Sequence, residues 1–185
     1  MSTSRCMAVW IVAAALLSAC ATQMSGTSTT VRAPNLGHEV TPNEAAAWDI
    51  SIPPSGAGLP GGSGTARQGT SIYAAKCMAC HGEKGTGKPA DQLVGGIGSL
   101  TSAKPVRTVG SYWPYATTLF DYVRRAMPIT NPLSLSNDEV YAVCAYILNL
   151  NGIIGEDAIM TASTLPQVKM PNRDGFISDW PVRPR

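Results

Sequence analysis

The sequence is poor in charged residues and has no hydrophobic run long enough to span a membrane. Asp, Glu, Lys and Arg make up 14% of its 185 residues, whereas about 25% is typical of globular proteins. The formal net charge is only +2, which argues against nucleic-acid binding and against docking driven by strong net charge. The apolar run over residues 7–17 is too short for a permanent transmembrane helix and is typical of a signal-peptide core.

Histidine is also scarce, with only His38 and His81 in the chain, and strand patterns are weak throughout. Cys77, Cys80 and His81 form a CxxCH motif. A zinc site would need two further Cys or His ligands, and a thioredoxin-like redox pair would sit in a βαβ pattern. In a c-type haem site, each thiol instead bonds one haem vinyl group and the histidine becomes the proximal iron ligand. The motif therefore predicts one covalently attached haem c.

The N-terminus has the features of a bacterial export signal. Arg5 precedes the apolar run, which ends in a Leu-Ser-Ala-Cys sequence at Cys20 that resembles the lipobox of bacterial lipoproteins. By that resemblance, residues 1–19 are a signal peptide and Cys20 is the acylated N-terminus of a lipid-anchored periplasmic protein. Ala21, in place of Asp, favours the outer membrane. The alternative is an ordinary secretory signal and a soluble periplasmic protein.

The other cysteines agree with this compartment. Covalent haem attachment to CxxCH is generally completed on the exported side of the membrane. Once the signal and the haem motif have taken four of the five cysteines, Cys144 remains alone, so no structural disulfide is available. Cys144 lies in an apolar helical pattern and is predicted to be a buried small hydrophobe.

Composition divides the chain after the signal into three parts. Residues 20–64 are rich in Thr, Ser, Gly and Pro and are predicted to be a flexible tether. Residues 65–152 are predicted to form a small all-α domain around the haem. Residues 153–185 have no sustained periodicity and are predicted to be an irregular extension packed on the domain.

Three main helices are predicted in the domain. The first covers residues 65–79 and carries the haem motif at its C-terminal end. The second covers residues 114–126, with Pro114 in its first turn. The third begins with a capping box at Ser136 and is closed by Gly152.

A second axial ligand would make the haem an electron carrier, and methionine is the candidate. A thioether ligand raises the reduction potential because it favours ferrous iron. Met127 stands at the end of the second helix, where enough chain separates it from His81 to reach the opposite haem face. Competing methionines are Met160, Met78, which is badly placed inside the motif, and Met170, which is also followed by proline but lies in the tail. Position between the helices favours Met127, and Met170 stays the alternative.

With these features the chain resembles a class I cytochrome c. In that family the first and last helices cross, and a glycine on the first lets an aromatic residue of the last approach. The resemblance implies that Gly69 and Tyr73 meet Tyr146. It also implies His81 as the proximal ligand and Met127 as the distal one.

A narrower resemblance covers most of the chain from residue 64 onward. Three segments are similar to the monohaem cytochrome subunits that partner molybdenum sulfite dehydrogenases, including that of the bacterial sulfur-oxidation (Sox) complex. These segments are residues 108–128, 135–152 and 169–176. The resemblance implies a cytochrome that accepts electrons from a molybdenum subunit and passes them to a soluble carrier or terminal oxidase. The lipobox and tether depart from many of those periplasmic subunits.

No set of acid, base and nucleophile suggests catalysis by this chain, so we expect an electron-transfer protein and not an enzyme. The dehydrogenase partner and a general membrane-tethered carrier to a terminal oxidase are both consistent with the haem site. A five-coordinate sensor or peroxidase is disfavoured by Met127. Aromatic residues that could form a partner interface or cover the core are Trp48, Tyr112, Trp113 and Tyr115.

The charged residues near the site have ordinary interpretations beside functional ones. Arg124 and Arg125 could contact a haem propionate or a partner, or stabilise the helix dipole. Asp121 is interpreted as helix-surface charge. The lysines of the haem loop could guide docking or form a solvated face; they are Lys84, Lys88 and Lys104.

Overall fold

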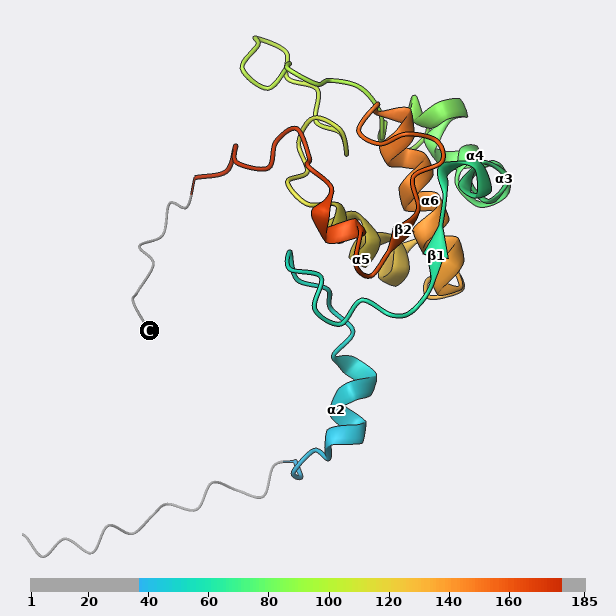
Figure 1. Cartoon of the computed structure of the whole chain (residues 1–185), viewed down its shortest axis with the longest axis vertical. Helices are drawn as coiled ribbons and strands as arrows, with labels where there is room; N and C mark the ends of the chain where they lie inside the picture. The colour runs from blue at the N-terminus through green and yellow to red at the C-terminus, as the bar shows by residue number, and fades with distance from the viewer. Residues whose placement is uncertain (1–36, 178–185) are drawn as a thin grey trace, which may run out of the picture. The chain divides into compact units, whose positions relative to one another are not determined.

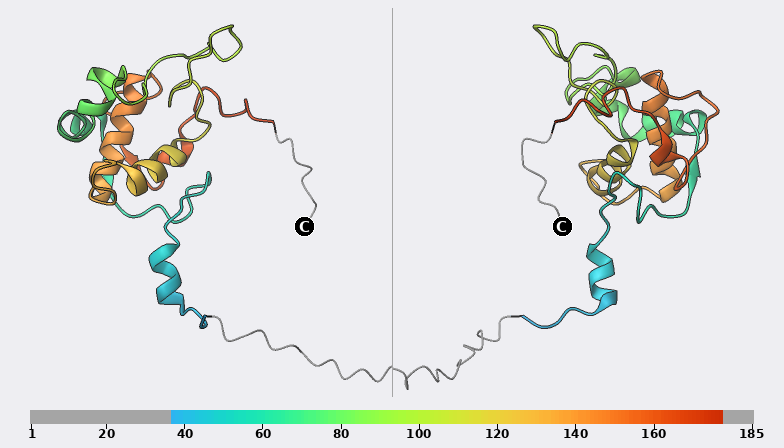
Figure 2. Two further views of the ribbon diagram at one scale, coloured as in Figure 1. Left: turned by 180° about the vertical axis from the view of Figure 1, so that it is seen from behind. Right: turned by 60° about the vertical axis from the view of Figure 1, so that its left-hand side comes forward.

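The computed structural model describes residues 37–177, so the predicted signal peptide and Cys20 lie outside the described residues. The chain divides into two units, residues 1–45 and 46–185. Helix α2 (Pro42–Trp48) crosses that boundary, and none of its residues is buried. The other elements belong to the second unit (Figures 1 and 2). In chain order they are β1 (Ser63–Gly64), α3 (Ala66–Lys76), α4 (Met78–His81), the 3₁₀ turn η1 (Glu83–Gly85), α5 (Ala116–Ala126), α6 (Asn137–Leu150), β2 (Met160–Thr161) and the 3₁₀ turn η2 (Leu165–Gln167).

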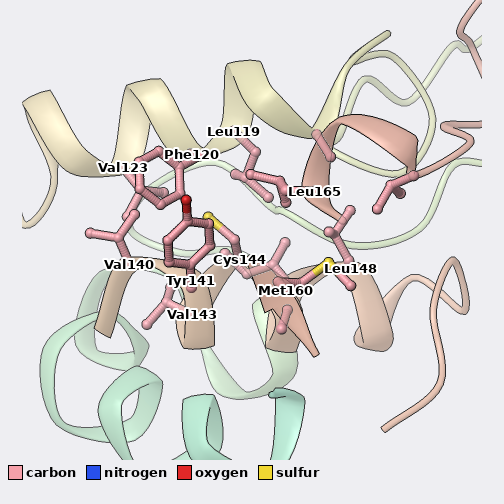
Figure 3. Packing of buried hydrophobic residues seen from close by; sticks show 14 of the residues in the cluster. Leu119, Phe120, Val123, Val140, Tyr141, Val143, Cys144, Leu148, Met160 and Leu165 are labelled. Atoms are coloured by element: carbon pink, nitrogen blue, oxygen red, sulfur yellow. The ribbon is translucent and has the colours of Figure 1, made fainter. Parts of the chain in front are cut away.

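Helix α6 is the centre of the hydrophobic core. Its apolar residues between positions 140 and 148 are almost all buried. Leu119, Phe120 and Val123 of α5 face this helix across the core, as Figure 3 shows. The rings of Phe120 and Tyr141 lie 4.5 Å apart between centroids, within the range of favourable aromatic pairs. The small all-α domain that the sequence predicted is therefore built on the packing of α5 and α3 against α6.

Helices α3 and α6 cross at Gly69, where the absence of a side chain lets the two backbones approach closely. A Cβ on Gly69 would lie 2.0 Å from the carbonyl oxygen of Ala142 and 2.8 Å from Cβ of Tyr146. The rings of Tyr73 and Tyr146 lie 5.1 Å apart between centroids. The predicted meeting of Gly69, Tyr73 and Tyr146 is confirmed.

The helix boundaries differ from the prediction at two places and agree at a third. The predicted helix over residues 65–79 is two helices, because α3 ends at Lys76 and the chain bends at Cys77 before α4. Helix α5 begins at Ala116, so Pro114 lies ahead of its first turn. The capping box of α6 is present, and Gly152 closes the helix with a φ of 69°.

Residues 51–64, here called the strap, were predicted to belong to the tether but pack on the domain. Ile52 is 6% exposed within the hydrophobic core. The Tyr141 hydroxyl donates to the Pro60 carbonyl oxygen at 2.9 Å, and the backbone N–H of Ser63 donates to the Asp138 carboxylate at 2.7 Å. Hydrogen bonds and one buried apolar side chain hold this Pro- and Gly-rich segment, which is irregular up to the short strand β1 at its end.

The C-terminal extension contributes to the same core. Strand β2 pairs antiparallel with β1, with Met160 opposite Gly64. Met160, Leu165, Val168 and Met170 of the extension are all buried. The extension therefore packs on the domain through Met170, whereas residues 173–177 are exposed.

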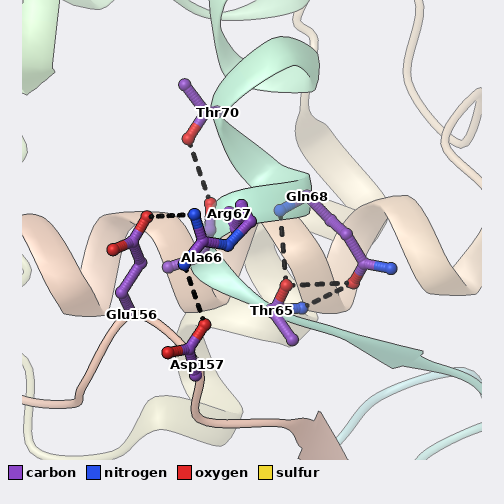
Figure 4. A network of polar contacts seen from close by, with 7 residues as sticks. All are labelled: Thr65, Ala66, Arg67, Gln68, Thr70, Glu156 and Asp157. Carbon is purple, nitrogen blue, oxygen red and sulfur yellow. Dashed lines mark hydrogen bonds and ion pairs between the residues drawn. The ribbon is translucent and has the colours of Figure 1, made fainter.

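Surface ion pairs also join the extension to α3, as Figure 4 shows. Arg67 contacts Glu156 at 3.5 Å and Asp157 at 3.0 Å, beside the capping box of Thr65 and Gln68. Exposed pairs of this kind contribute little to stability, because water and salt screen them. Of the helices within residues 37–177, none combines the length and the apolar character that crossing a bilayer requires.

Candidate haem site

The three residues of the CxxCH motif lie at the bend between α3 and α4. Cys77 is the joint between the two helices, and Cys80 and His81 lie on α4. Both thiols are free, with Cys77 half-buried and Cys80 exposed. Burial raises the pKa of the Cys77 thiol to about 11. Cys144 is also free but fully buried in α6, as predicted.

The imidazole of His81 is oriented by a backbone carbonyl. Its Nδ1 lies 2.8 Å from the carbonyl oxygen of Asp91. A carbonyl oxygen can only accept, so Nδ1 carries a proton and the neutral ring has its lone pair on Nε2. Such a hydrogen bond fixes the ring orientation and raises the basicity of a metal-ligating histidine. His81 is therefore prepared to bind a metal through Nε2.

The chain that follows His81 is held close to the motif. The hydroxyl of Tyr73 donates to the Gly82 carbonyl oxygen at 3.0 Å, and burial raises the pKa of this phenol to about 12. The N–H of Gly87 donates to the His81 carbonyl oxygen at 2.7 Å, and the N–H of Ala90 donates to the Cys80 carbonyl oxygen at 2.8 Å. These bonds place Asp91 within reach of the imidazole.

Asn151 anchors the next part of this loop, and its role was missed in the sequence. Its Oδ1 accepts from the Gly95 N–H at 3.0 Å, and its Nδ2 donates to the carbonyl oxygens of Leu93 and Ile147. The side chain is buried, and a Cβ on Gly110 would lie 2.1 Å from its Oδ1. A buried amide at the end of α6 thus connects the haem-motif loop to the core. In the sequence, this role could have been suggested only by the position of Asn151 directly before Gly152, the glycine that closes α6.

The methionine candidates lie in different environments. Met127 follows the last residue of α5 in an extended conformation, and its N–H donates to the Val123 carbonyl oxygen at 3.1 Å. Its side chain is half-buried against the core. Met170 is 3% exposed and Met160 is 5% exposed, so both serve as core residues. Met127 combines a helix end with partial exposure, which suits a ligand that faces a bound group.

These side chains fit a haem c. Two free thiols, an imidazole with an available Nε2 and a thioether are the donors that covalent attachment and His/Met ligation of haem require. Within residues 37–177, no group of three or more His, Cys, Asp and Glu side chains is placed to hold a metal ion.

The charges near Met127 form a local pair that the sequence interpretation did not anticipate. Arg125 binds the carboxylate of Asp121, and its Nε lies 3.0 Å from Asp121 Oδ1. The Asp121 carboxylate raises the pKa of the Arg125 guanidinium. The side chain of Asp121 is only 13% exposed, so its interpretation as helix-surface charge was wrong. Arg125 therefore has a partner within its own helix.

Two comparisons with known proteins found similar chains. Residues 64–147 match the family described as cytochrome c oxidase, cbb3-type, subunit III. A chain in the crystal structure of the sulfane dehydrogenase SoxCD from Paracoccus pantotrophus is 43% identical and superposes with a TM-score of 0.74. The match covers 78% of this chain and 72% of that chain. No curated protein matches the sequence significantly.

Proposed function

Because this chain belongs to the cytochrome c family, we propose that it accepts single electrons from a molybdenum sulfite or sulfur-compound dehydrogenase. The chain is an electron-carrying haem protein with covalently bound haem c. The observation that carries the narrower proposal is its 43% identity to a chain of a sulfane dehydrogenase over most of its length.

The site residues have distinct roles in this proposal. The thiols of Cys77 and Cys80 would hold the haem covalently, and His81 and Met127 would ligate its iron. When bound, the haem would supply reversible one-electron chemistry. The Asp91 carbonyl oxygen fixes the orientation of the His81 ring, and the half-buried Met127 keeps part of its side chain accessible to a bound group.

An aromatic patch offers a surface for the redox partner. Tyr112 is 36% exposed and Phe176 51% exposed, and their rings lie 5.1 Å apart between centroids. The guanidinium of Arg107 lies 5.5 Å from the centroid of the Tyr112 ring. Tyrosine, phenylalanine and arginine are enriched in protein–protein interfaces. We propose that this patch, defined by Arg107, Tyr112 and Phe176, contacts the dehydrogenase.

The compartment is also a proposal. The lipobox-like sequence before Cys20 supports a protein that is anchored by acyl chains on the periplasmic side of a bacterial membrane, with the outer membrane favoured.

Reduction by sulfite in native membranes tests the proposed donor. Solubilised membranes are mixed anaerobically with sulfite while the ferrous band of this cytochrome is recorded. Rapid reduction that disappears when the molybdenum subunit is removed is expected. Reduction by ascorbate but not by sulfite or a sulfane compound would contradict the dehydrogenase partner and leave a general carrier to a terminal oxidase.

The patch is tested in the same assay with two matched variants. Tyr112→Ala is expected to slow reduction by the dehydrogenase by about tenfold, because truncating an interface aromatic often costs more than 1 kcal/mol of binding. Ile159→Ala removes another exposed apolar side chain outside the patch and is expected to leave the rate unchanged. Equal rates in both variants would contradict docking at the patch.

A further inference from the structure

The carboxylate of Asp121 joins the N-terminal strap to α5. Its Oδ1 accepts from the backbone N–H of Ile52 at 2.9 Å and from Nε of Arg125 at 3.0 Å, and its second oxygen accepts from the Arg125 guanidinium. Residues 52 and 121 are 69 positions apart in the chain. Since the carboxylate is only 13% exposed, water competes weakly for these bonds.

The strap is fixed at its other end to α6 and not to α5. The Tyr141 hydroxyl donates to the Pro60 carbonyl oxygen, and the Asp138 carboxylate accepts from the Ser63 N–H. Near Ile52, the buried Thr117 of α5 makes a longer hydrogen bond of 3.4 Å to the Pro54 carbonyl oxygen. Asp121 therefore makes the shorter of the two hydrogen bonds that join the strap to α5.

The contacts of Asp121 lie directly before the candidate distal ligand. Arg125 is in the last turn of α5, the helix ends at Ala126, and Met127 follows in an extended conformation. The Met127 N–H donates to the Val123 carbonyl oxygen, so the backbone of the ligand belongs to that final turn. Helix ends have few hydrogen bonds of their own, so this turn can fray. Fraying would also free the backbone of Met127 and weaken its hold on the haem iron.

We propose that Asp121 is a positioning residue for Met127. By binding the strap and Arg125 together, it keeps the final turn of α5 closed and favours the arrangement in which the Met127 thioether ligates the haem iron. This inference rests on the proposed function, in which Met127 is the distal ligand. It adds the strap to the parts of the chain that support the haem site, although the strap contributes no residue to the haem motif.

Competition by imidazole measures how firmly Met127 is held. Imidazole binds ferric haem where the methionine leaves, so its apparent affinity rises as the methionine-bound state becomes less stable. Asp121→Ala is expected to bind imidazole about tenfold more tightly than the wild type, since hydrogen bonds to charged groups are lost. Hydrogen exchange of the amides at residues 123–127 is expected to accelerate by a similar factor.

Asp138→Ala is the matched control. It removes another bond between a strap N–H and a carboxylate, but at the start of α6 and not on α5. Its imidazole affinity is expected to stay within about twofold of the wild type, because well-separated sites act independently. An equal rise in imidazole affinity in both variants would overturn the proposal. The effect would then come from loosening the strap at either end and not from the contacts of Asp121 with α5.

A second variant covers the case in which Asp121→Ala does not fold. Asp121→Asn keeps an acceptor for the Ile52 N–H and loses the charge that binds Arg125, so a smaller gain in imidazole affinity is expected. Unchanged affinity in every folded Asp121 variant would overturn the positioning role.

The wild-type spectrum separates this failure from failure of the ligand assignment. An iron–sulfur charge-transfer band in the ferric wild type that is lost in Met127→Ala supports Met127 as the ligand, whatever Asp121 does. A band that persists in Met127→Ala would overturn both the ligand assignment and the inference that depends on it.

Discussion

Gly69 and Ala142 bring the backbones of α3 and α6 into direct contact, since a Cβ on Gly69 would lie 2.0 Å from the Ala142 carbonyl oxygen. We predict that Gly69→Ala lowers the free energy of unfolding by about 3 kcal/mol, at the upper end for overpacking, because a backbone atom is the obstacle. Alanine gains about 1 kcal/mol of helix propensity over glycine, which offsets only part of this cost. Denaturant unfolding of the haem-loaded protein measures the difference.

Ser71→Ala is the control for this substitution. Ser71 is exposed on the same helix, so the change improves helix propensity without a steric conflict. Its stability is expected to stay within about 0.5 kcal/mol of the wild type. A Gly69→Ala protein as stable as Ser71→Ala would show that the helices do not cross as closely as described.

The two Met-Pro methionines are predicted to respond in opposite ways to truncation. Met127→Ala should abolish the ferric iron–sulfur charge-transfer band, because it removes the proposed ligand. Met170→Ala should keep the band and lower the free energy of unfolding by about 2–5 kcal/mol, since Met170 is 3% exposed in the core. Absorption spectra and denaturant titrations of both variants provide the comparison. Loss of the band in Met170→Ala alone would reverse the assignment.

The cysteines of the described residues are predicted to have two different roles, haem attachment for Cys77 and Cys80 and core packing for Cys144. Without Cys77 and Cys80, denatured protein should carry no covalent haem by mass spectrometry. Cys144→Ala should retain all of its haem and lose about 1–2 kcal/mol of stability, because Cys144 is fully buried among apolar side chains. Haem that survives denaturation in the double variant Cys77→Ala, Cys80→Ala would contradict thioether attachment at this motif.

The parts of this protein that can be predicted from sequence are those that depend on short-range patterns. The CxxCH motif places Cys77, Cys80 and His81 within one turn of chain, and the capping box of α6 needs only residues three positions apart. The crossing at Gly69 follows from family resemblance, because a single glycine in a helix has no local signature of a distant partner.

The strap and the anchor at Asn151 could not be predicted for the opposite reason. Ile52 is one apolar residue in a Pro- and Gly-rich segment, and its partner Asp121 is 69 positions away. The amide of Asn151 reaches Gly95 across 56 positions. Neither contact leaves a periodicity in the sequence, because both depend on how separate elements meet in the fold.

The ion pair between Lys76 and Glu139 is predicted to make stability depend on acidic pH. Lys76 Nζ lies 2.7 Å from Glu139 Oε1, and Glu139 also accepts from the backbone N–H of Ser136. The hydrogen bond from Lys76, and then that from Ser136, lowers the pKa of the Glu139 carboxyl below its usual value. A carboxyl whose pKa is lower in the folded state stabilises the fold above its unfolded pKa, and this stability is lost as pH falls through the folded pKa.

Glu139→Gln tests this pH dependence, because glutamine keeps a capping partner for Ser136 and removes the charge. Between about pH 6 and pH 3, where carboxyl groups titrate, the free energy of unfolding should fall less in Glu139→Gln than in the wild type. Lys76→Met should show a similarly reduced slope, since Lys76 is the largest cause of the lowered pKa. Comparison with the wild type cancels the titration of other groups that all three proteins share. Parallel curves for the three proteins would show that this pair, which links α3 just before the haem motif to α6, contributes nothing to acid stability.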